Sequence, residues 1–273
     1  MLLGTQLRRL REQAGITLED AGHAIRASHS KMSRIELGRV GFKERDVADL
    51  LTLYGVTDEK QREAALKLAR EANTPGWWHN YADVLPDWFE TYVAFEEVAT
   101  RIRAYEVQFV PGLLQTEEYT HAVARLGHPQ ASKNEIERRV TLRMARQKLL
   151  TDPGAPHLWT VLDEAALRRC PCGPAGMREQ LRRLITANAM PNVTIQVLPF
   201  RAGGHPAGAA FTILRFAEAE IPDVVYLEQL TSALYLEKQD AVDSYQLVME
   251  SLCVRAAPPP ETERILGEML RAL

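Results

Sequence analysis

The sequence has few cysteines and no long apolar run. Its 273 residues include only Cys170, Cys172 and Cys253, whose spacing fits neither a disulfide framework nor a structural zinc site. We therefore expect all three thiols to be reduced. No segment approaches about 18 uninterrupted apolar residues, and no basic flank leads into an apolar run at the N-terminus. These absences predict a cytoplasmic protein that is neither secreted nor inserted into a membrane.

The sequence also lacks the motifs of the common enzyme classes. It contains no G-x-S-x-G nucleophile elbow, no G-x-x-x-x-G-K-[ST] phosphate loop and no H-E-x-x-H zinc motif. Cys170 and Cys172 are separated by a single proline, which is too short a spacing for the usual redox or zinc pair. His79 and Asp83 stand four residues apart, but no third ligand completes a metal site. We therefore predict a protein without catalytic activity, cofactor or metal.

The small net charge of −3 conceals an asymmetry along the chain. Residues 1–45 carry nine lysines and arginines against five acidic residues, a local charge of +4, so the other 228 residues sum to −7. A modest basic region on an otherwise acidic protein favours a nucleic-acid partner for that region. The length and the apolar content of 46% are typical of a globular protein with two domains.

The stretch from Thr17 to Gly38, T-L-E-D-A-G-H-A-I-R-A-S-H-S-K-M-S-R-I-E-L-G, predicts two short helices joined by a tight turn. Thr17 is a good N-cap residue, and two acidic residues follow it in the first turn, where the helix dipole favours negative charge. The small pair Ala21 and Gly22 allows the second helix to cross the first closely. This pattern is typical of a helix-turn-helix.

The second predicted helix of this stretch carries polar residues outside its apolar stripe. Ser28 is its N-cap candidate, and Met32 and Ile35 form the stripe. The other positions are His29, Ser30, Lys31, Ser33 and Arg34. Taken alone, these five residues fit either a solvated surface or a surface that contacts nucleic acid. The tandem arrangement of the two helices favours the second alternative.

The same stretch, from Gly15 onward, resembles the helix-turn-helix of phage-repressor-like regulators of the xenobiotic response element type. M-S-R-I-E-L-G matches the closing run of their second helix. Leu18 stands where the family often has a glutamine that contacts a phosphate or a base. Arg26 replaces the usual turn glycine, so either Arg26 adopts a conformation that glycine favours or the turn differs. The resemblance implies a compact DNA-binding domain of five helices.

From this pattern we predict which residues contact DNA. The second helix of the motif should enter the major groove. The base contacts are assigned to His29, Ser30, Ser33 and Arg34, and the phosphate contacts to Arg9, Thr17, Lys31, Arg39 and Lys43.

We expect the all-α helix-turn-helix domain to cover residues 1–73 and a larger α+β domain to cover residues 87–273. Between them, residues 74–86 contain several aromatic side chains, which predicts a docked linker and not a flexible one. In the second domain, short runs rich in β-branched or aromatic residues occupy 158–163, 193–198, 210–216 and 224–228. They predict a sheet of four or five strands covered by helices.

Two other segments of the second domain carry specific expectations. The apolar spacing from Pro86 to about Tyr105 predicts one long buried helix. The helix expected over 133–150 is rich in arginine, which indicates either a second DNA contact or a solvated helix face, and we favour the solvated face. The basic residues in question are Arg138, Arg139, Arg143, Arg146 and Lys148.

Two features near the C-terminus leave alternatives open. The loop R-A-G-G-H-P-A-G around His205 is either a plain hairpin loop or the rim of a surface that binds a ligand or a partner. The last helix, with Ile265, Leu266, Met269 and Leu270 on one stripe, either closes the domain or pairs with a second subunit.

Four segments of the second domain resemble the uncharacterised C-terminal domain of many actinobacterial helix-turn-helix regulators. They are V-P-G-L-L-Q-T-E-E-Y, V-L-D-E-A-A-L-R-R, N-V-T-I-Q-V-L-P-F and L-Y-L-E. This resemblance implies a regulator that is often encoded beside a small partner protein in a toxin–antitoxin-like pair. It also implies a C-terminal domain that senses or binds something.

Together these observations predict a sequence-specific transcriptional regulator that binds double-stranded operator DNA as a homodimer and is nucleoid-associated through that binding. The C-terminal domain is expected to dimerise and to bind an effector or a small protein encoded nearby. Its binding surface is assigned to Trp77, Trp78, His205, Tyr226 and Tyr235. The alternative is an antitoxin-like interaction protein whose main role is to bind and neutralise a small partner protein.

Overall fold

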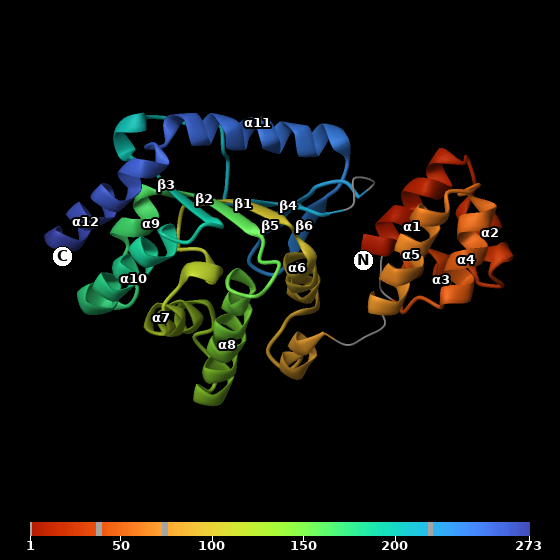
Figure 1. Ribbon diagram of the computed structural model, residues 1–273. Coiled ribbons are helices and arrows are strands. Elements are labelled where there is room, and N and C mark those ends of the chain that lie inside the picture. Colours follow the sequence, from red (N-terminus) through yellow and green to blue (C-terminus); the bar gives the residue numbers. More distant parts are fainter. Residues whose placement is uncertain (1, 37–39, 73–75, 218–220) are drawn as a thin grey trace. The chain divides into compact units, whose positions relative to one another are not determined.

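The computed structural model describes residues 2–36, 40–72, 76–217 and 221–273. The chain divides into two compact units (Figure 1). The first consists mainly of Met1–His79, and the second comprises Asn80–Ala217 and Pro222–Leu273. Within the described ranges, no helix is both long enough and apolar enough to cross a membrane.

The first unit is a bundle of five helices, as predicted. They are α1 (Leu2–Gln13), α2 (Leu18–Ala24), α3 (His29–Glu36), α4 (Glu44–Leu53) and α5 (Glu59–Ala72). Apolar residues at helical spacing from all five helices form one core, which includes Leu7, Met32 and Leu51. Leu18, at the position where the related regulators often have a glutamine, packs against this core.

The turn between α2 and α3 is closed by a left-handed residue. Arg26 has a φ of 54°, which is the first of the two alternatives that the sequence left open. The backbone N–H of Ala27 then donates to the carbonyl of Gly22 at 2.8 Å. A Cβ atom on Gly22 would lie 2.8 Å from the carbonyl oxygen of Ala27, so this close return of the chain requires glycine.

The second unit is built on a mixed sheet of six strands, one more than the upper limit predicted from the sequence. The strands are β1 (Arg101–Glu106), β2 (His157–Asp163), β3 (Val193–Leu198), β4 (Phe211–Arg215), β5 (Val224–Glu228) and β6 (Ala233–Leu236). Their order is β3-β2-β1-β4-β5-β6. β1, β2 and β3 are parallel, whereas β4, β5 and β6 each run antiparallel to the preceding neighbour in that order.

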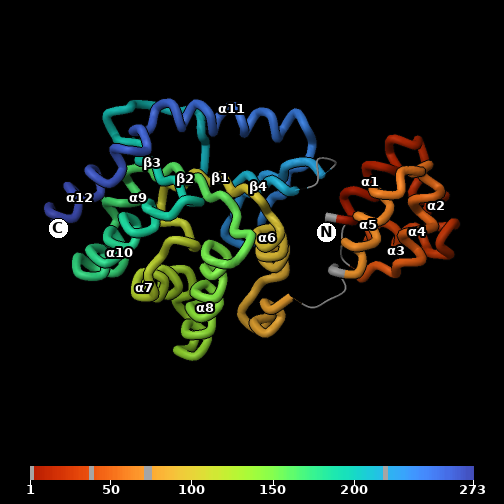
Figure 2. The backbone as a smooth tube through the Cα atoms, in the orientation of Figure 1, coloured from red at the N-terminus to blue at the C-terminus, as the bar shows by residue number. Residues whose placement is uncertain are grey.

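The prediction of one helix from Pro86 to about Tyr105 is wrong. Helix α6 (Asp87–Val98) ends before an extended Ala99, and the chain then enters β1, as Figure 2 shows. In β1 the buried Ile102 and Ala104 alternate with arginines, which is the period of a strand. Two ladders, with β2 and β4, hold this segment in the middle of the sheet. Strand β6 was not predicted, because its sequence A-L-Y-L has no β-branched residue.

Helices cover both faces of the sheet (Figure 1). Helix α11 (Gln239–Arg255) packs on the face that carries Tyr105, Phe211 and Val225. Figure 1 shows α6, α7, α8 and α10 on the opposite side of the sheet. Their bounds, with those of the short helix α9, are Glu117–Gly127 for α7, Lys133–Arg146 for α8, Glu164–Arg168 for α9 and Gly173–Asn188 for α10.

The last helix, α12 (Thr262–Ala272), packs against α10 and β3. Ile265, Leu266 and Met269 are buried there. The hydroxyl of Thr262 donates to the carbonyl of Ile195 in β3 and so anchors the start of the helix. Of the two roles that the sequence left open, α12 therefore closes the domain.

Candidate functional site

Helix α3 presents a polar face away from the core of the first unit. His29, Ser30 and Arg34 are exposed and Ser33 is half-buried, whereas Met32 is fully buried. The four predicted base-contacting residues occupy i, i+1, i+4 and i+5, so they lie along one side of the helix.

The start of α3 is fixed by a side-chain cap. The hydroxyl of Ser28 accepts a hydrogen bond from the backbone N–H of Lys31 at 3.2 Å, as its predicted N-cap role requires. Lys31 itself is half-buried. Because the cap sets the first turn, it also sets the direction in which His29 and Ser30 leave the helix.

The residues predicted to contact phosphates differ in exposure and in the hydrogen bonds that they already make. Lys43 is exposed at the N-cap position of α4, and Arg9 is half-buried on α1. The hydroxyl of Thr17 caps α2: it accepts from the backbone N–H of Asp20 at 3.1 Å and donates to the Asp20 carboxylate at 2.7 Å. Its hydrogen is therefore already used within the protein. Arg39 lies outside the described residues.

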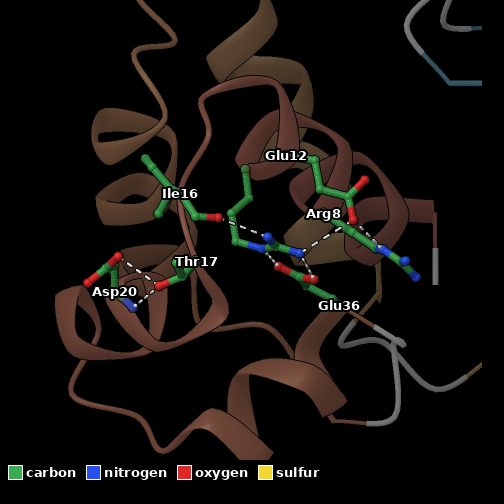
Figure 3. A network of polar contacts seen from close by, with 7 residues as sticks. Arg8, Glu12, Ile16, Thr17, Asp20 and Glu36 are labelled. Carbon is green, nitrogen blue, oxygen red and sulfur yellow. Dashed lines mark hydrogen bonds and ion pairs between the residues drawn. The ribbon is translucent and has the colours of Figure 1, made fainter.

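A buried ion pair fastens α3 to α1 (Figure 3). Nε of Arg11 donates to Oε1 of Glu36 at 2.6 Å, and a terminal nitrogen donates to Oε2 at 3.0 Å. The other terminal nitrogen donates to the carbonyl of Ile16 at 2.9 Å. The exposed fractions of Arg11 and Glu36 are only 8% and 6%, and the hydrogen bond to Glu36 raises the pKa of Arg11. This bidentate pair therefore fixes the C-terminal end of α3.

A close backbone approach supports the same junction. A Cβ atom on Gly4 would lie 2.5 Å from the carbonyl oxygen of Glu36 and 2.7 Å from that of Ile35. Only glycine leaves room for α1 to approach the last turn of α3 this closely. Sequence reasoning assigned no role to Gly4 or to the Arg11–Glu36 pair, although Glu36 stands inside the motif M-S-R-I-E-L-G.

Family comparisons agree with this geometry. Residues 2–65 match a family model described as a helix-turn-helix domain. Residues 89–268, more than half of the chain, match the model of a domain of unknown function, DUF5753. The chain belongs to the DUF5753 family. No curated protein and no solved structure matches it. The helix-turn-helix domain indicates a DNA-binding transcriptional regulator.

In the DUF5753 domain, two of the predicted binding residues lie in one aromatic group. The ring centroids of Tyr226 and Tyr235 are 5.3 Å apart, and the ring of Tyr226 also lies 4.3 Å from that of Tyr92 of α6, at a tilt of 38°. The hydroxyl of Tyr226 donates to Glu228 at 3.0 Å, and that of Tyr235 donates to the carbonyl of Trp88 at 2.6 Å. Tyr226 is buried, so its side chain is not available on the surface to contact a partner.

His205, a third predicted residue, lies on the other face of the sheet. Its Nε2 is 3.1 Å from the hydroxyl oxygen of Tyr105, and that hydroxyl also donates to Asp163 at 3.3 Å. Burial and the nearby Asp163 carboxylate raise the pKa of Tyr105. The loop around His205 is thus docked on the ends of β1 and β2.

Trp77 and Trp78 lie in a different unit from these three residues. They open the 3₁₀ helix η1 (Trp77–Tyr81), where both are half-buried and their rings meet edge to face at 6.0 Å. The five residues assigned to one binding surface therefore do not form one group: Trp77 contacts Trp78, Tyr226 contacts Tyr235, and His205 lies apart from both pairs.

The prediction of a solvated basic face on α8 is wrong for Arg143 and Arg146. Arg146 is buried and donates through two nitrogens to Glu96 of α6, both at 2.8 Å. Its guanidinium also lies 4.9 Å from the ring centroid of Phe89. Arg146 shares a helical face with Leu142, which is the sequence signal that indicates its burial.

Arg143 is fixed by a different set of contacts. A terminal nitrogen donates to Oε1 of the buried Gln115 at 2.9 Å, and Thr120 donates to the same oxygen at 3.0 Å. Gly112 lies against the side chain, because a Cβ atom there would be 3.6 Å from Cδ of Arg143. The charges of Glu228 and Glu106, the last residues of β5 and β1, favour the charged form of the Arg143 guanidinium and so raise its pKa, against the larger lowering by burial. Sequence reasoning assigned no role to Glu106 and rejected a catalytic role for Glu228.

Proposed function

We propose that this member of the DUF5753 family is a sequence-specific transcriptional regulator that binds operator DNA as a homodimer through α3. The observation that carries the proposal is the exposed polar side of α3, which is fixed to the bundle by the buried Arg11–Glu36 pair. In helix-turn-helix proteins the second helix of the motif lies in the major groove. A helix held this firmly presents its side chains to base edges at little entropic cost.

The side chains on α3 divide into two roles in this proposal. His29, Ser30, Ser33 and Arg34 contact base edges, and the exposed Arg34 is suited to a bidentate contact with O6 and N7 of a guanine. Such a contact contributes ~1–3 kcal/mol of discrimination between bases. The phosphate contacts add affinity that falls steeply with salt. They are assigned to Arg9, Thr17, Lys31, Arg39 and Lys43.

The DUF5753 domain is proposed to act by binding and not by catalysis. Its partner is a small effector molecule or a small protein encoded nearby, and its binding modulates the affinity of the regulator for DNA. The domain is also proposed to hold the homodimer together. A dimer implies an operator with two half-sites about 34–36 Å apart, which is one turn of the DNA helix, or a multiple of that distance.

Genome-wide mapping of bound sites, with and without the neighbouring small protein, tests this proposal. We expect enriched sites that share a motif with two half-sites. A duplex containing that motif should lose most of its affinity for Arg34→Ala in fluorescence anisotropy, whereas Lys60→Ala, at an exposed position on α5, should bind normally. If a small partner protein is captured but no shared motif is enriched, the antitoxin-like alternative replaces the proposal.

A further inference from the structure

Three arginines, Arg101, Arg103 and Arg215, lie on the face of the sheet that α11 covers. Arg101 and Arg103 stand two positions apart in β1, so they share a face with Tyr105, which packs under α11. Arg215 of β4 is the register partner of Arg101 and lies on the same face. Side chains directly opposite each other on antiparallel strands have Cβ atoms about 4.5–5.5 Å apart, and like charges there are destabilising. The strands therefore place positive charges side by side.

A small cavity joins these three residues, which we call the arginine cluster (Arg101, Arg103 and Arg215). Its volume is about 10 Å³, which is room for about one water-sized group. Arg101 and Arg215 are exposed, whereas Arg103 is half-buried. The lining carries three positive charges and one negative charge, a net charge of +2. The lining residues are Arg101, Arg103, Ile213, Arg215, Asp223 and Gln246.

The acidic residue of the cavity is already engaged. Asp223, in the loop between β4 and β5, accepts hydrogen bonds from Nε of Arg215 at 2.9 Å and from a terminal nitrogen of Arg215 at 2.7 Å. The side-chain amide of Gln246 in α11 donates to the same carboxylate at 2.8 Å. Among the residues that the structure describes, neither Arg101 nor Arg103 has a carboxylate within ion-pair distance. Two of the three arginines therefore lack a counter-ion.

Arg103 also lacks a good hydrogen-bond acceptor. Its Nε atom is buried and makes no hydrogen bond within the described ranges. A terminal nitrogen donates to the sulfur of Cys253 at 3.9 Å, and a thiol sulfur is a weak acceptor. The guanidinium lies 5.7 Å from the ring centroid of Trp159. A buried donor on a charged group is costly without a partner, so Arg103 is satisfied only when an acceptor enters the cavity beside it.

We infer that the arginine cluster binds the phosphate group of a small effector. A phosphate monoester carries about −1.5 to −2 charges at pH 7, which matches the net charge of the cavity, and arginine binds its oxygens in bidentate fashion. One oxygen enters the cavity beside Arg103, and the others contact the exposed Arg101 and Arg215. A carboxylate would leave one positive charge uncompensated. The inference rests on the proposed effector role and deepens it by naming the chemical class of the effector.

The backbone phosphates of DNA offer similar chemistry, but the charges favour a small molecule. Each phosphate of the DNA backbone carries a single negative charge, which is less than the cavity can compensate. The 228 residues that follow residue 45 also sum to −7, so a long polyanion is repelled by the surroundings of the cluster. A small phosphate ester places its charge at the arginines alone.

NMR of the full chain, with ¹⁵N-labelled tryptophan, tests this inference with inorganic phosphate as the probe. The indole N–H of Trp159 donates to Gln196 at 2.8 Å, and its ring lies beside Arg103, so its signal reports on the cavity. Trp159→Phe identifies that signal. At pH 7 and constant ionic strength, phosphate should shift it with saturation, and acetate and chloride should bind about tenfold more weakly or worse. The absence of a saturable shift with phosphate, or equal binding of acetate, overturns the inference.

Variants locate the binding in the cluster. Arg101→Gln and Arg103→Gln should each weaken phosphate binding about tenfold or more, whereas Arg271→Gln, at an exposed position on α12, should bind like the parent protein. Arg101 is exposed, so Arg101→Gln remains informative if Arg103→Gln fails to fold by circular dichroism. Unchanged phosphate binding by folded Arg101→Gln overturns the inference.

A further titration separates the two sources of phosphate. A short duplex of random sequence, at the same concentration of phosphate groups, should leave the Trp159 signal in place. A shift as large as that with inorganic phosphate overturns the assignment to a small effector. Because the phosphate titration contains no DNA, its failure leaves operator binding standing, and failure of operator binding leaves the phosphate result standing.

Discussion

The buried Arg11–Glu36 pair should be among the most costly interactions to break in the first unit. Replacing one partner leaves a buried charge without a counter-ion, which destabilises a protein by about 3–5 kcal/mol. Arg11→Met also removes the hydrogen bond to the carbonyl of Ile16, a loss of about 0.5–1.5 kcal/mol. A domain is typically stable by only about 5–15 kcal/mol, so either single substitution brings this bundle close to unfolding.

Amide hydrogen exchange of the full chain measures this loss locally. In Arg11→Met and in Glu36→Leu, peptides from α1 and α3 should exchange about 100-fold faster or more, since about 1.4 kcal/mol corresponds to a factor of ten. Peptides from β1 and β2, in the other unit, should be unchanged. The double variant Arg11→Met/Glu36→Leu removes both charges together, so it should be less destabilised than the sum of the single variants.

Two results would refute this reasoning. Single variants whose α1 and α3 peptides exchange less than about fivefold faster would show that the pair contributes less than about 1 kcal/mol. A double variant whose loss equals the sum of the two single losses would show that the two side chains do not stabilise each other.

Three other substitutions have expected outcomes. Arg26→Gly should stabilise the first unit by up to about 1 kcal/mol, because a left-handed conformation costs a non-glycine residue about 1–2 kcal/mol. Part of this gain is lost because glycine gives up more conformational entropy on folding than arginine does. A lower melting temperature would contradict this prediction. Gly4→Ala should destabilise α1 and α3 by at least about 1–3 kcal/mol in the same exchange experiment, because its Cβ atom would overlap the carbonyl of Glu36; Gly127→Ala has open space and is the control. Glu106 binds a proton more tightly in the folded protein than in the unfolded chain, so its contribution to stability is complete at low pH and is lost as the pH rises to about 8. In urea unfolding between pH 5 and 8, the parent protein should therefore lose up to about 1.4 kcal/mol per pH unit relative to Glu106→Gln, and parallel curves would contradict the raised pKa.

Much of the first unit was predictable because its signals are local. The cap at Thr17, the apolar stripe of α3 and the unusual turn at Arg26 each depend on residues within a few positions of one another. The ion pair between Arg11 and Glu36 is not local, since it joins residues that stand 25 positions apart. A pattern within one helix carries no information on such a partner.

The second unit was less predictable for the same reason. β1 has enough apolar residues to continue the periodicity of α6, and its alternation with arginines is too short to distinguish a strand before its pairing with β2 and β4 is known. In the sequence the arginines of α8 look like a solvated helix face. The ion-pair partner of Arg146 is Glu96, which stands 50 positions earlier and so gives no local signal. Glu106 and Glu228 end β1 and β5, and only the order of the sheet, with β4 between these two strands, brings them near each other.

The central claim is that the exposed side of α3 recognises a DNA sequence. In vitro selection from a random duplex library, performed with the parent protein and with Arg34→Ala, tests it most directly. The parent protein should enrich a motif with a required guanine, and Arg34→Ala should select the same motif with that position relaxed. A parent protein that enriches no motif, or an Arg34→Ala variant that selects an identical motif with equal affinity, would contradict the claim.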